Sequence, residues 1–351
     1  MGLVRDPLWT VRQLNMYPDR IGDYKILSTL GTGTFGDVYR VEKGGNEYAM
    51  KDIVIGAKVD NLILQMEVDS HKSIPKHDNI VEFIDSFKSK YNWYIVLEYC
   101  ALGTLEDYVI AHRPDKDIAT SFMLDMARGL HHLHSNNIVH RDIKPENILM
   151  VKGPYGIPRC KISDFGVARF GTVESDPGLN NGAVQEERYF QSLCGTPYFL
   201  APEVKNRQYT RSCDVFSLGI VFYLLFSKDS SSGKRLTPWA KGGTPFYRAT
   251  DTQIKDQLKV HVHDVTIYTL IESMLLIDFH NRVTAKALVG HLMALEVPDD
   301  EVFIAAWVLV AVLAMLAIFP FPLFVLTVVV LLLACWEFLP RSTFRKVSPF
   351  S

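Results

Sequence analysis

The sequence predicts an α+β fold of two lobes, a small β-rich lobe followed by a larger helical lobe, with an apolar segment beyond them. Three observations predict this order. Strand-like segments crowd the chain up to Glu98, helical periodicity prevails after Gly103, and the composition changes abruptly near Asp299. We therefore divide the chain into an N-terminal extension (1–23), a folded domain (24–297), an apolar segment (302–339) and a short basic tail (340–351).

The predicted strands are short runs rich in β-branched and aromatic residues. They are Tyr24–Leu30, Asp37–Val41, Glu47–Val54, Val81–Phe87 and Trp93–Glu98. One helical pattern, Asn61–Ser73, interrupts them. Beyond Gly103, apolar residues recur at three- and four-residue intervals in Ile118–Ser135 and Asp214–Phe226, as they do on one face of a helix.

Composition limits the classes of partner. The 351 residues include 37 Lys and Arg against 39 Asp and Glu, so net charge gives no argument for nucleic acid as a partner. The five cysteines lack the spacing of metal ligands or of a disulfide framework, which suits a reducing cytosol. They are Cys100, Cys160, Cys194, Cys213 and Cys335.

A glycine-rich stretch, Gly31-Thr32-Gly33-Thr34-Phe35-Gly36-Asp37-Val38, lies between two predicted strands. Glycines at such a hairpin let the backbone close over phosphate groups without obstruction by side chains. A dinucleotide-binding loop of the same pattern would be followed by a helix, whereas Val38–Val41 continues as a strand. The alternative is that the glycines serve only a tight turn.

Lys51 ends the strand-like run Tyr48-Ala49-Met50-Lys51, fifteen residues after Gly36. A lysine at this point could hold the α- and β-phosphates of ATP. A buried ammonium needs a carboxylate partner, and we expect that partner to be Glu67 on the predicted helix, rather than the nearby Asp69. The alternatives are a solvated lysine and an ordinary exposed glutamate.

The most specific signal is a set of three motifs in order: His140-Arg141-Asp142-Ile143-Lys144-Pro145-Glu146-Asn147, then Asp164-Phe165-Gly166, then Ala201-Pro202-Glu203. Together with the glycine-rich stretch and Lys51, they make the sequence resemble the eukaryotic protein kinase family from Tyr24 to about Leu295. The resemblance implies the bilobal protein kinase fold, ATP and Mg²⁺ as cofactors, and transfer of the ATP γ-phosphate to hydroxyl groups of protein substrates.

The resemblance also implies a role for each catalytic residue. Asp142 would orient the substrate hydroxyl and accept its proton, while Asn147 and Asp164 would supply the oxygen ligands that Mg²⁺ prefers. Lys144 would reach the transferred phosphoryl group and marks the serine/threonine-directed form of this loop, and Thr196 fits the same interpretation. These residue types suit phosphoryl transfer, which depends on positioning and on neutralising charge.

For the ATP pocket, the resemblance implies a loop over the phosphates, a lysine that holds them, and a hinge, Glu98-Tyr99-Cys100, whose backbone reads the adenine edge. Leu97 would stand at the back of the adenine pocket. The residues predicted to contact ATP are Gly31, Gly33, Phe35, Gly36, Val38, Ala49, Lys51, Leu97, Glu98 and Cys100.

Other matches predict scaffolding and regulation. Glu203 and Arg282 resemble the buried ion pair of the family, and Asp214 resembles the carboxylate that braces the catalytic loop. Arg141 resembles a cation that pairs with a phosphorylated residue of the activation segment, and Ser192 occupies the matching place. The alternative is that acidic residues inside this segment satisfy Arg141 without phosphorylation.

Val302–Trp336 contains 35 residues and no ionisable side chain except Cys335. A straight helix of that length would extend about 50 Å, against about 30 Å for the hydrocarbon core of a bilayer. Pro320-Phe321-Pro322 supplies a break. We therefore expect a membrane anchor, either a single kinked span or a hairpin within one leaflet.

The flanking charges favour the hairpin. The apolar run is preceded by Asp299, Asp300 and Glu301 and followed by Arg341, Arg345 and Lys346. Basic flanks favour the cytosolic side of a membrane, and ATP and Mg²⁺ require a cytosolic kinase domain. A hairpin keeps both ends in the cytosol, whereas a single span places the basic tail in a lumen. We expect a membrane location, with an endomembrane as one candidate.

The sequence thus predicts a membrane-anchored serine/threonine protein kinase acting on proteins near its membrane. A pseudokinase is one alternative, but the residues whose loss usually marks one are present: Lys51, Asp142, Asn147 and Asp164. A second alternative is a membrane tether or scaffold in which catalysis is incidental.

Overall fold

The computed structural model describes residues 19–33, 36–55, 61–165, 169–170, 198–206, 210–227 and 245–296. The chain divides into one compact unit over 1–293 and a second over 294–351, and both lobes of the fold belong to the first. The predictions on Phe35, Ser192, Thr196, 302–339 and 340–351 lie outside the described residues. Among the helices that are described, none is long and apolar enough to cross a bilayer.

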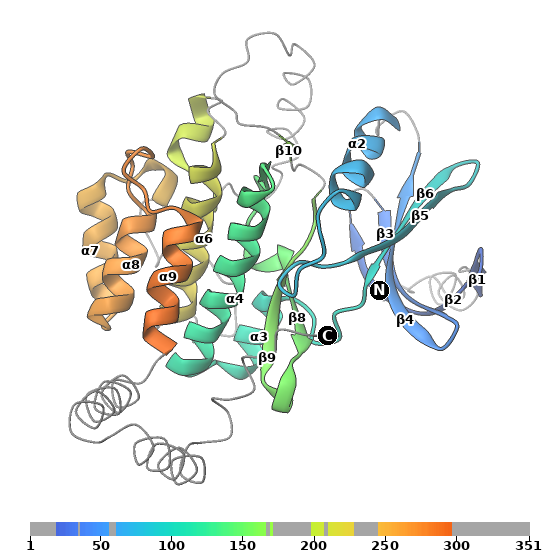
Figure 1. The fold of residues 1–351 in the computed structure, drawn as a ribbon, viewed down its shortest axis with the longest axis horizontal. Helices are drawn as coiled ribbons and strands as arrows, with labels where there is room; N and C mark the ends of the chain where they lie inside the picture. Colours follow the sequence, from blue (N-terminus) through green and yellow to red (C-terminus); the bar gives the residue numbers. More distant parts are fainter. Residues whose placement is uncertain are drawn as a thin grey trace, which may run out of the picture. The chain divides into compact units, whose positions relative to one another are not determined.

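The N-terminal lobe is built on an antiparallel sheet of six strands in the order β1-β2-β3-β4-β6-β5 (Figure 1). The strands are β1 (Arg20–Ile21), β2 (Tyr24–Gly33), β3 (Gly36–Lys43), β4 (Asn46–Val54), β5 (Phe83–Lys88) and β6 (Asn92–Glu98). Four of the five predicted strands overlap these closely, and the fifth, predicted from Val81, begins at Phe83. The prediction of a β-rich first lobe is confirmed.

One helix, α2 (Asn61–Lys72), packs against one face of this sheet (Figure 1). Its buried residues Leu64 and Val68 share a core with Ile53, Trp93 and Ile95. The opposite face of the sheet has a separate core, formed by Ile21, Tyr24, Tyr39, Val41, Met50 and Val96. Successive strand residues point to opposite faces, so β4 and β6 each contribute to both cores.

The larger lobe is helical, as predicted. Its helices are α3 (Leu105–His112), α4 (Lys116–Ser135), α6 (Arg211–Phe226), α7 (Asp251–His261), α8 (Val265–Met274) and α9 (Ala285–Glu296). Every residue of α6 from Cys213 to Leu224 is buried, so this helix forms the centre of the lobe. Helix α4 begins two residues before the predicted Ile118 because Asp115 caps it, its side chain accepting a hydrogen bond from Ile118 N.

A hairpin of β8 (Ile148–Lys152) and β9 (Pro158–Ile162) lies on α4 and reaches the smaller lobe. The segment between α2 and β5 bonds to it through two backbone hydrogen bonds, Val81 N to Ile162 O and Ile162 N to Asn79 O, each 2.9 Å. The Asn79 amide also donates to Cys160 O at 3.0 Å. The short strands β7 (Ile138–Val139) and β10 (Arg169–Phe170) pair beside the catalytic loop.

Candidate active site

Asp142 lies in the loop between β7 and the short helix η1 (Pro145–Asn147), where two neighbours converge on its carboxylate. Lys144 Nζ donates to Asp142 Oδ2 at 2.7 Å, and Asn147 Nδ2 donates to the same oxygen at 2.8 Å. Asn147 Nδ2 is also 2.8 Å from the backbone oxygen of Asp142, which fixes the loop in a tight arc. The structure therefore brings together three of the residues predicted to act in catalysis and metal binding.

The charges of this pair are adjusted by their surroundings. Burial raises the pKa of Asp142, and the ammonium of Lys144 only partly opposes that effect. Burial lowers the pKa of Lys144, but attraction and hydrogen bonding to Asp142 outweigh it, so this pKa is raised. A carboxylate of raised pKa is a better proton acceptor than an ordinary surface aspartate.

Asp164 follows β9 and faces Lys51 of the smaller lobe. Its Oδ1 lies 3.4 Å from Lys51 Nζ, and its backbone is in the left-handed region with φ +62°. Mainly because of Lys51, the pKa of Asp164 is lowered to about 2. The carboxylate is therefore ionised at neutral pH. The predicted partner Glu67 is on α2, but its side chain lies outside the described residues.

Mg²⁺ binds oxygen ligands in near-octahedral geometry and commonly takes one or two from carboxylates, with phosphate oxygens and water completing the set. Asp164 fits this requirement because it is ionised. Asn147 fits because its amide nitrogen is turned toward Asp142, which directs its oxygen to the other side. The donor set of this loop suits Mg²⁺ bound together with nucleotide phosphates.

Asp214, in the first turn of α6, holds the catalytic loop in the way predicted. Its Oδ2 accepts from His140 N at 2.8 Å and from His134 Nε2 at 2.9 Å, and its Oδ1 accepts from Arg141 N at 2.7 Å. Arg141 has φ +70°, a left-handed conformation that is costly for a side chain with a Cβ. These bonds to a buried carboxylate stabilise that conformation beside Asp142.

The described residues of the glycine-rich stretch lie at the ends of β2 and β3, with Gly31 opposite Val38 and Gly33 opposite Gly36. A Cβ at Gly36 would lie 1.7 Å from the backbone oxygen of Asp52 on β4, and its φ of +144° is one that L residues rarely adopt. A Cβ at Gly31 would meet nothing within 4 Å. Gly36 therefore allows two strands to approach, which is a structural requirement independent of phosphate binding.

The residues predicted to enclose adenine include Ala49 and Leu97, which lie where β4 and β6 pair. Ala49 is opposite Leu97, and Lys51 is opposite both Val38 and Ile95, so these residues belong to adjacent strands. Cys100 is buried, and burial raises the pKa of its thiol to about 12. Its thiol is therefore protonated at neutral pH.

Sequence reasoning missed the role of the Glu98 side chain. Glu98 Oε2 accepts from Lys161 Nζ of β9 at 2.9 Å and from the backbone N of Glu82 at 3.2 Å. The carboxylate thus joins the hinge to β9 and to the segment before β5. Only the spatial proximity of three distant segments reveals this contact.

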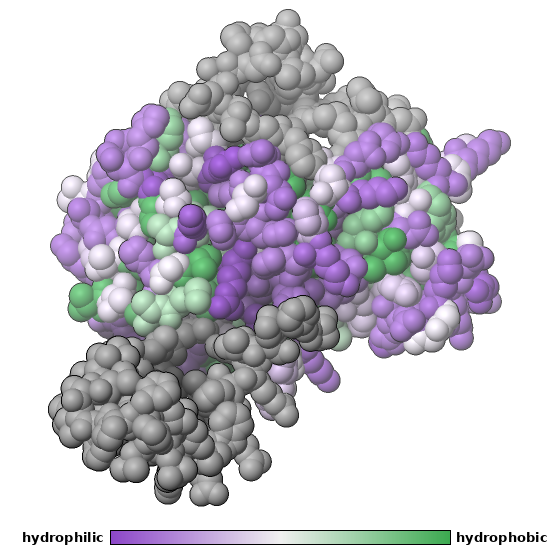
Figure 2. Space-filling model, viewed as in Figure 1, coloured by the Kyte–Doolittle hydropathy of each residue, from purple (hydrophilic) through white to green (hydrophobic). Residues whose placement is uncertain are grey.

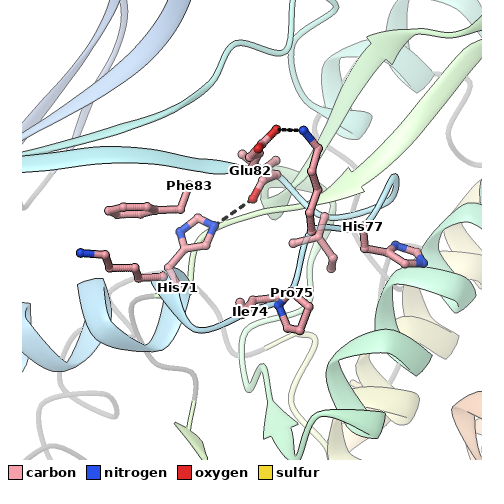
Figure 3. A pocket seen from close by; sticks show the side chains of 10 residues that line it. His71, Ile74, Pro75, His77, Glu82 and Phe83 are labelled. Atoms are coloured by element: carbon pink, nitrogen blue, oxygen red, sulfur yellow. Dashed lines mark hydrogen bonds and ion pairs between the residues drawn. The ribbon is translucent and has the colours of Figure 1, made fainter. Parts of the chain in front are cut away.

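Sequence reasoning also missed His71, the buried residue four positions after Glu67. Its ring lies in a row of aromatic rings. The distances between ring centroids are 5.7 Å from His71 to Phe83, 4.5 Å from His71 to Phe165 and 5.2 Å from Phe165 to His140. His71 Nε2 donates to Val81 O at 2.9 Å, and burial lowers its pKa to about 4 (Figure 3). Residues four apart share a helix face, so the spacing from Glu67 was the available signal.

A cavity of about 110 Å³ borders this ring (Figure 3). It is lined by the loop between α2 and β5, including Ile74, Pro75 and His77. Lys76 and Glu82 also line it and form an ion pair, with 2.7 Å between Lys76 Nζ and Glu82 Oε2. None of the residues predicted to contact ATP lines it.

The predicted ion pair of Glu203 and Arg282 is present and buried. Arg282 makes two parallel bonds to the carboxylate, Nη1 to Oε1 at 2.6 Å and Nη2 to Oε2 at 3.0 Å. Arg282 also donates to backbone oxygens of Ser212 and Leu276. It therefore joins the Ala201-Pro202-Glu203 motif to α6 and to the segment before α9.

Comparison with known proteins agrees with this geometry. The family described as "Protein kinase domain" matches residues 24–293. The chain is similar to probable serine/threonine-protein kinase fhkC of Dictyostelium discoideum (30% identity, 76% of this chain, 44% of that protein). It is also similar to serine/threonine-protein kinase ATG1a of Arabidopsis thaliana (29% identity, 80% of this chain, 44% of that protein). A third relative is the membrane-associated tyrosine- and threonine-specific cdc2-inhibitory kinase wee-1.3 of Caenorhabditis elegans (30% identity, 76% of this chain, 36% of that protein).

The match covers most of the chain, and the chain belongs to the protein kinase family. The prediction of a protein kinase domain is confirmed by this match, and two of the relatives are named serine/threonine-protein kinase. The chain spans less than half the length of these three relatives, which therefore contain regions without a counterpart in it.

Proposed function

We propose that this protein is a membrane-anchored serine/threonine protein kinase that transfers the γ-phosphate of ATP to hydroxyl groups of protein substrates. The observation that carries the proposal is the convergence of Lys144 and Asn147 on the carboxylate of Asp142. The ionised Asp164 with its neighbour Lys51 supplies the second half of the site.

In the proposed reaction, the substrate hydroxyl oxygen bonds to the γ-phosphorus as the bond from that phosphorus to the ADP oxygen breaks. Asp142 orients the hydroxyl and takes its proton, a role that its raised pKa supports. Lys144, bonded to the same carboxylate, places its positive charge beside the transferred group. Bound Mg²⁺ would neutralise phosphate charge, held by Asn147 and Asp164.

ATP would lie under the β2–β3 turn. Gly31 has open space where a side chain would stand, so the backbone can approach phosphates at that point. Lys51 would hold the α- and β-phosphates, leaving Asp164 to the metal. Val38, Ala49 and Leu97 would enclose the adenine, and the backbone of Glu98 and Cys100 would bind its edge.

We propose serine and threonine as acceptors because Lys144 stands in the catalytic loop, and because two of the relatives bear the name serine/threonine-protein kinase. The relative wee-1.3 is named for tyrosine and threonine, which makes tyrosine the acceptor to test beside them.

Membrane anchoring is proposed from the composition of 302–339, which carries 35 consecutive residues without a charged side chain. The word "membrane-associated" in the name of wee-1.3 is consistent with such a role. The basic tail favours a hairpin with the kinase domain in the cytosol.

Regulation through Ser192 is the remaining part of the proposal. A phosphate there would add a partner for Arg141, whose backbone Asp214 already holds in place. Ser192→Ala should lower turnover, with Ser192→Asp restoring part of it. Equal rates for all three proteins would assign that role to acidic residues of the same segment.

The test of the proposed activity is transfer of radiolabelled phosphate to serine-, threonine- and tyrosine-containing peptides. Asp142→Asn should lower turnover about 10²- to 10⁴-fold by removing the base, and Lys51→Met should do so by removing the phosphate-holding cation. Asp256→Asn, in an exposed pair with Lys259, is the matched control and should retain the wild-type rate. A wild-type rate in Asp142→Asn would refute the role of Asp142 as the base, and absence of transfer by the wild-type protein would leave the alternative of a binding module without catalysis.

A further inference from the structure

The exposed apolar side chains of the helical lobe are gathered at one end of it. Among the residues described between Gly103 and Met293, five large apolar side chains are exposed. They are Tyr155 (76%), Ile157 (48%), Val260 (64%), Val265 (77%) and Met293 (49%). We call this set the basal face. Figure 2 shows apolar surface on the lower part of this lobe, in the same view as Figure 1.

Tyr155 and Ile157 are in the turn between β8 and β9, and contacts with α4 give the direction of that hairpin. A Cβ at Gly129 of α4 would lie 3.1 Å from Ile162, whereas Asp125, one turn nearer the start of α4, pairs with Arg159 at 2.6 Å. Following β9 back from Ile162 therefore leads toward the first residues of α4. The turn lies at that end, as Figure 1 shows.

Val260 and Val265 flank the turn between α7 and α8, and an ion pair attaches this turn to the same end. Lys116, the first residue of α4, has its Nζ 2.5 Å from Asp264 Oδ2. Met293 belongs to α9, which starts beside the last turn of α8, where Val283 N donates to Ser273 O at 3.2 Å. Helix α9 then runs back along α8, and the lower ends of both helices lie together in Figure 1.

We infer that the basal face is a membrane-contacting surface that rests on the bilayer holding the anchor, an inference that depends on the proposed membrane attachment. Val302, where the apolar run begins, follows Met293 by nine positions. At about 3.5 Å per extended residue, these positions span at most about 30 Å. A chain anchored from Val302 therefore keeps this end of the lobe close to the membrane.

The chemistry of the basal face fits the hydrocarbon boundary more than it fits anionic head groups. Aliphatic side chains and a tyrosine suit the interface, where an apolar body is buried and a hydroxyl stays hydrated. The helix ends and turns at this end of the lobe carry charges of both signs, among them Arg113, Lys116, Lys152 and Lys259, and Asp115, Asp117, Asp256 and Asp264. Contact should therefore depend little on anionic lipid.

This orientation holds the active site away from the bilayer. The catalytic loop follows the last turn of α4, and the 20 residues of this helix extend about 30 Å. The substrates would be protein segments that reach roughly that far from the membrane surface, rather than residues beside the lipid head groups.

Site-specific photocrosslinking tests the inference with the full-length chain in phosphatidylcholine vesicles. Tyr155→benzoylphenylalanine and Val260→benzoylphenylalanine place the probe on the basal face. Tyr91→benzoylphenylalanine is the matched control, because Tyr91 is 61% exposed just before β6, in the other lobe. Flotation measures membrane attachment, and mass spectrometry identifies what each probe captures.

We expect all three proteins to float, with lipid adducts at least tenfold more abundant at positions 155 and 260 than at 91, and unchanged when anionic lipid is added. Flotation with equal lipid adducts at all three positions would refute membrane contact by the basal face, while still supporting the anchor. Adducts to protein instead of lipid would assign the face to a second copy of the chain. Failure to float would overturn both the anchor and the inference.

Discussion

Replacing Asp214 by asparagine should disable the catalytic loop without removing any residue that touches substrate. The carboxylate accepts bonds from His140 N, His134 Nε2 and Arg141 N. Asparagine has one acceptor oxygen, so it can keep the first two bonds only by turning its NH₂ group against the N–H of Arg141. One charge-assisted bond is lost and a buried donor is stranded.

The expected cost follows from those losses. A hydrogen bond to a charged group contributes about 1.5–3 kcal/mol, and a stranded buried donor adds to it, so we expect destabilisation of about 2–4 kcal/mol. For a domain of this size, that lowers the melting temperature by roughly 4–7 °C. Turnover should fall as well, because Arg141 loses the bond that stabilises its left-handed backbone.

Thermal unfolding and peptide phosphorylation are measured on the same preparations of Asp214→Asn. The matched control is Asp115→Ala, which removes the cap of α4 at a cost of about 1 kcal/mol and leaves the active site untouched. The control should lose stability but keep its rate at saturating substrate. A variant at Asp214 with wild-type stability and rate would refute the bracing role.

The pH dependence gives a second check. Burial raises the pKa of Asp214, but the hydrogen bond and charge of His134, with other partners, lower it by more, so the pKa is lowered on folding. A lowered carboxyl pKa contributes stability above the unfolded value of about 3.9, and that contribution is lost as pH falls through the folded value. The difference in free energy of unfolding between wild type and Asp214→Asn should stay constant from pH 6 to 8 and shrink below about pH 4. A gap that persisted at low pH would assign the effect to something other than the carboxylate charge.

Two further predictions concern residues near the site. Gly36→Ala should destabilise the smaller lobe and abolish ATP binding because its Cβ would collide with the backbone of Asp52, whereas Gly31→Ala should keep the fold; equal melting temperatures would contradict this difference. Burial lowers the pKa of His71 to about 4, so folding favours the neutral ring. As pH falls from 6.5 to 4, the free energy of unfolding of the wild type should therefore fall by about 3 kcal/mol relative to that of His71→Leu. Parallel stability curves over that range would show that the ring stays accessible to protons.

Residues close together in the sequence were the ones whose arrangement could be predicted. Asp142, Lys144 and Asn147 lie within six positions of one loop, so the motif itself determines their proximity. The Glu203–Arg282 pair spans 79 positions and was predicted only by resemblance to a family. No periodicity in this chain would have joined those two residues.

The contacts that sequence reasoning missed depend on tertiary packing. The bond between Glu98 and Lys161 requires the hinge and β9 to lie side by side, and neither residue type indicates it. His71 was overlooked because a histidine in an amphipathic helix is usually taken for a surface residue. Its burial follows from the ring row between Phe83 and Phe165, which forms only when the two lobes meet.

The proposed anchor is tested by deleting it and by finding on which side of the membrane the tail lies. Deleting the chain from Val302 should release a kinase that no longer floats with membranes yet phosphorylates a generic peptide, because every catalytic motif lies upstream. Topology is tested in cells with an N-glycosylation acceptor placed beyond Ser351, well clear of the bilayer. The hairpin predicts no glycan, since the basic tail stays on the cytosolic side with the kinase domain. Efficient glycosylation would establish a single kinked span instead, and an intact chain that stays in the soluble fraction would contradict both topologies.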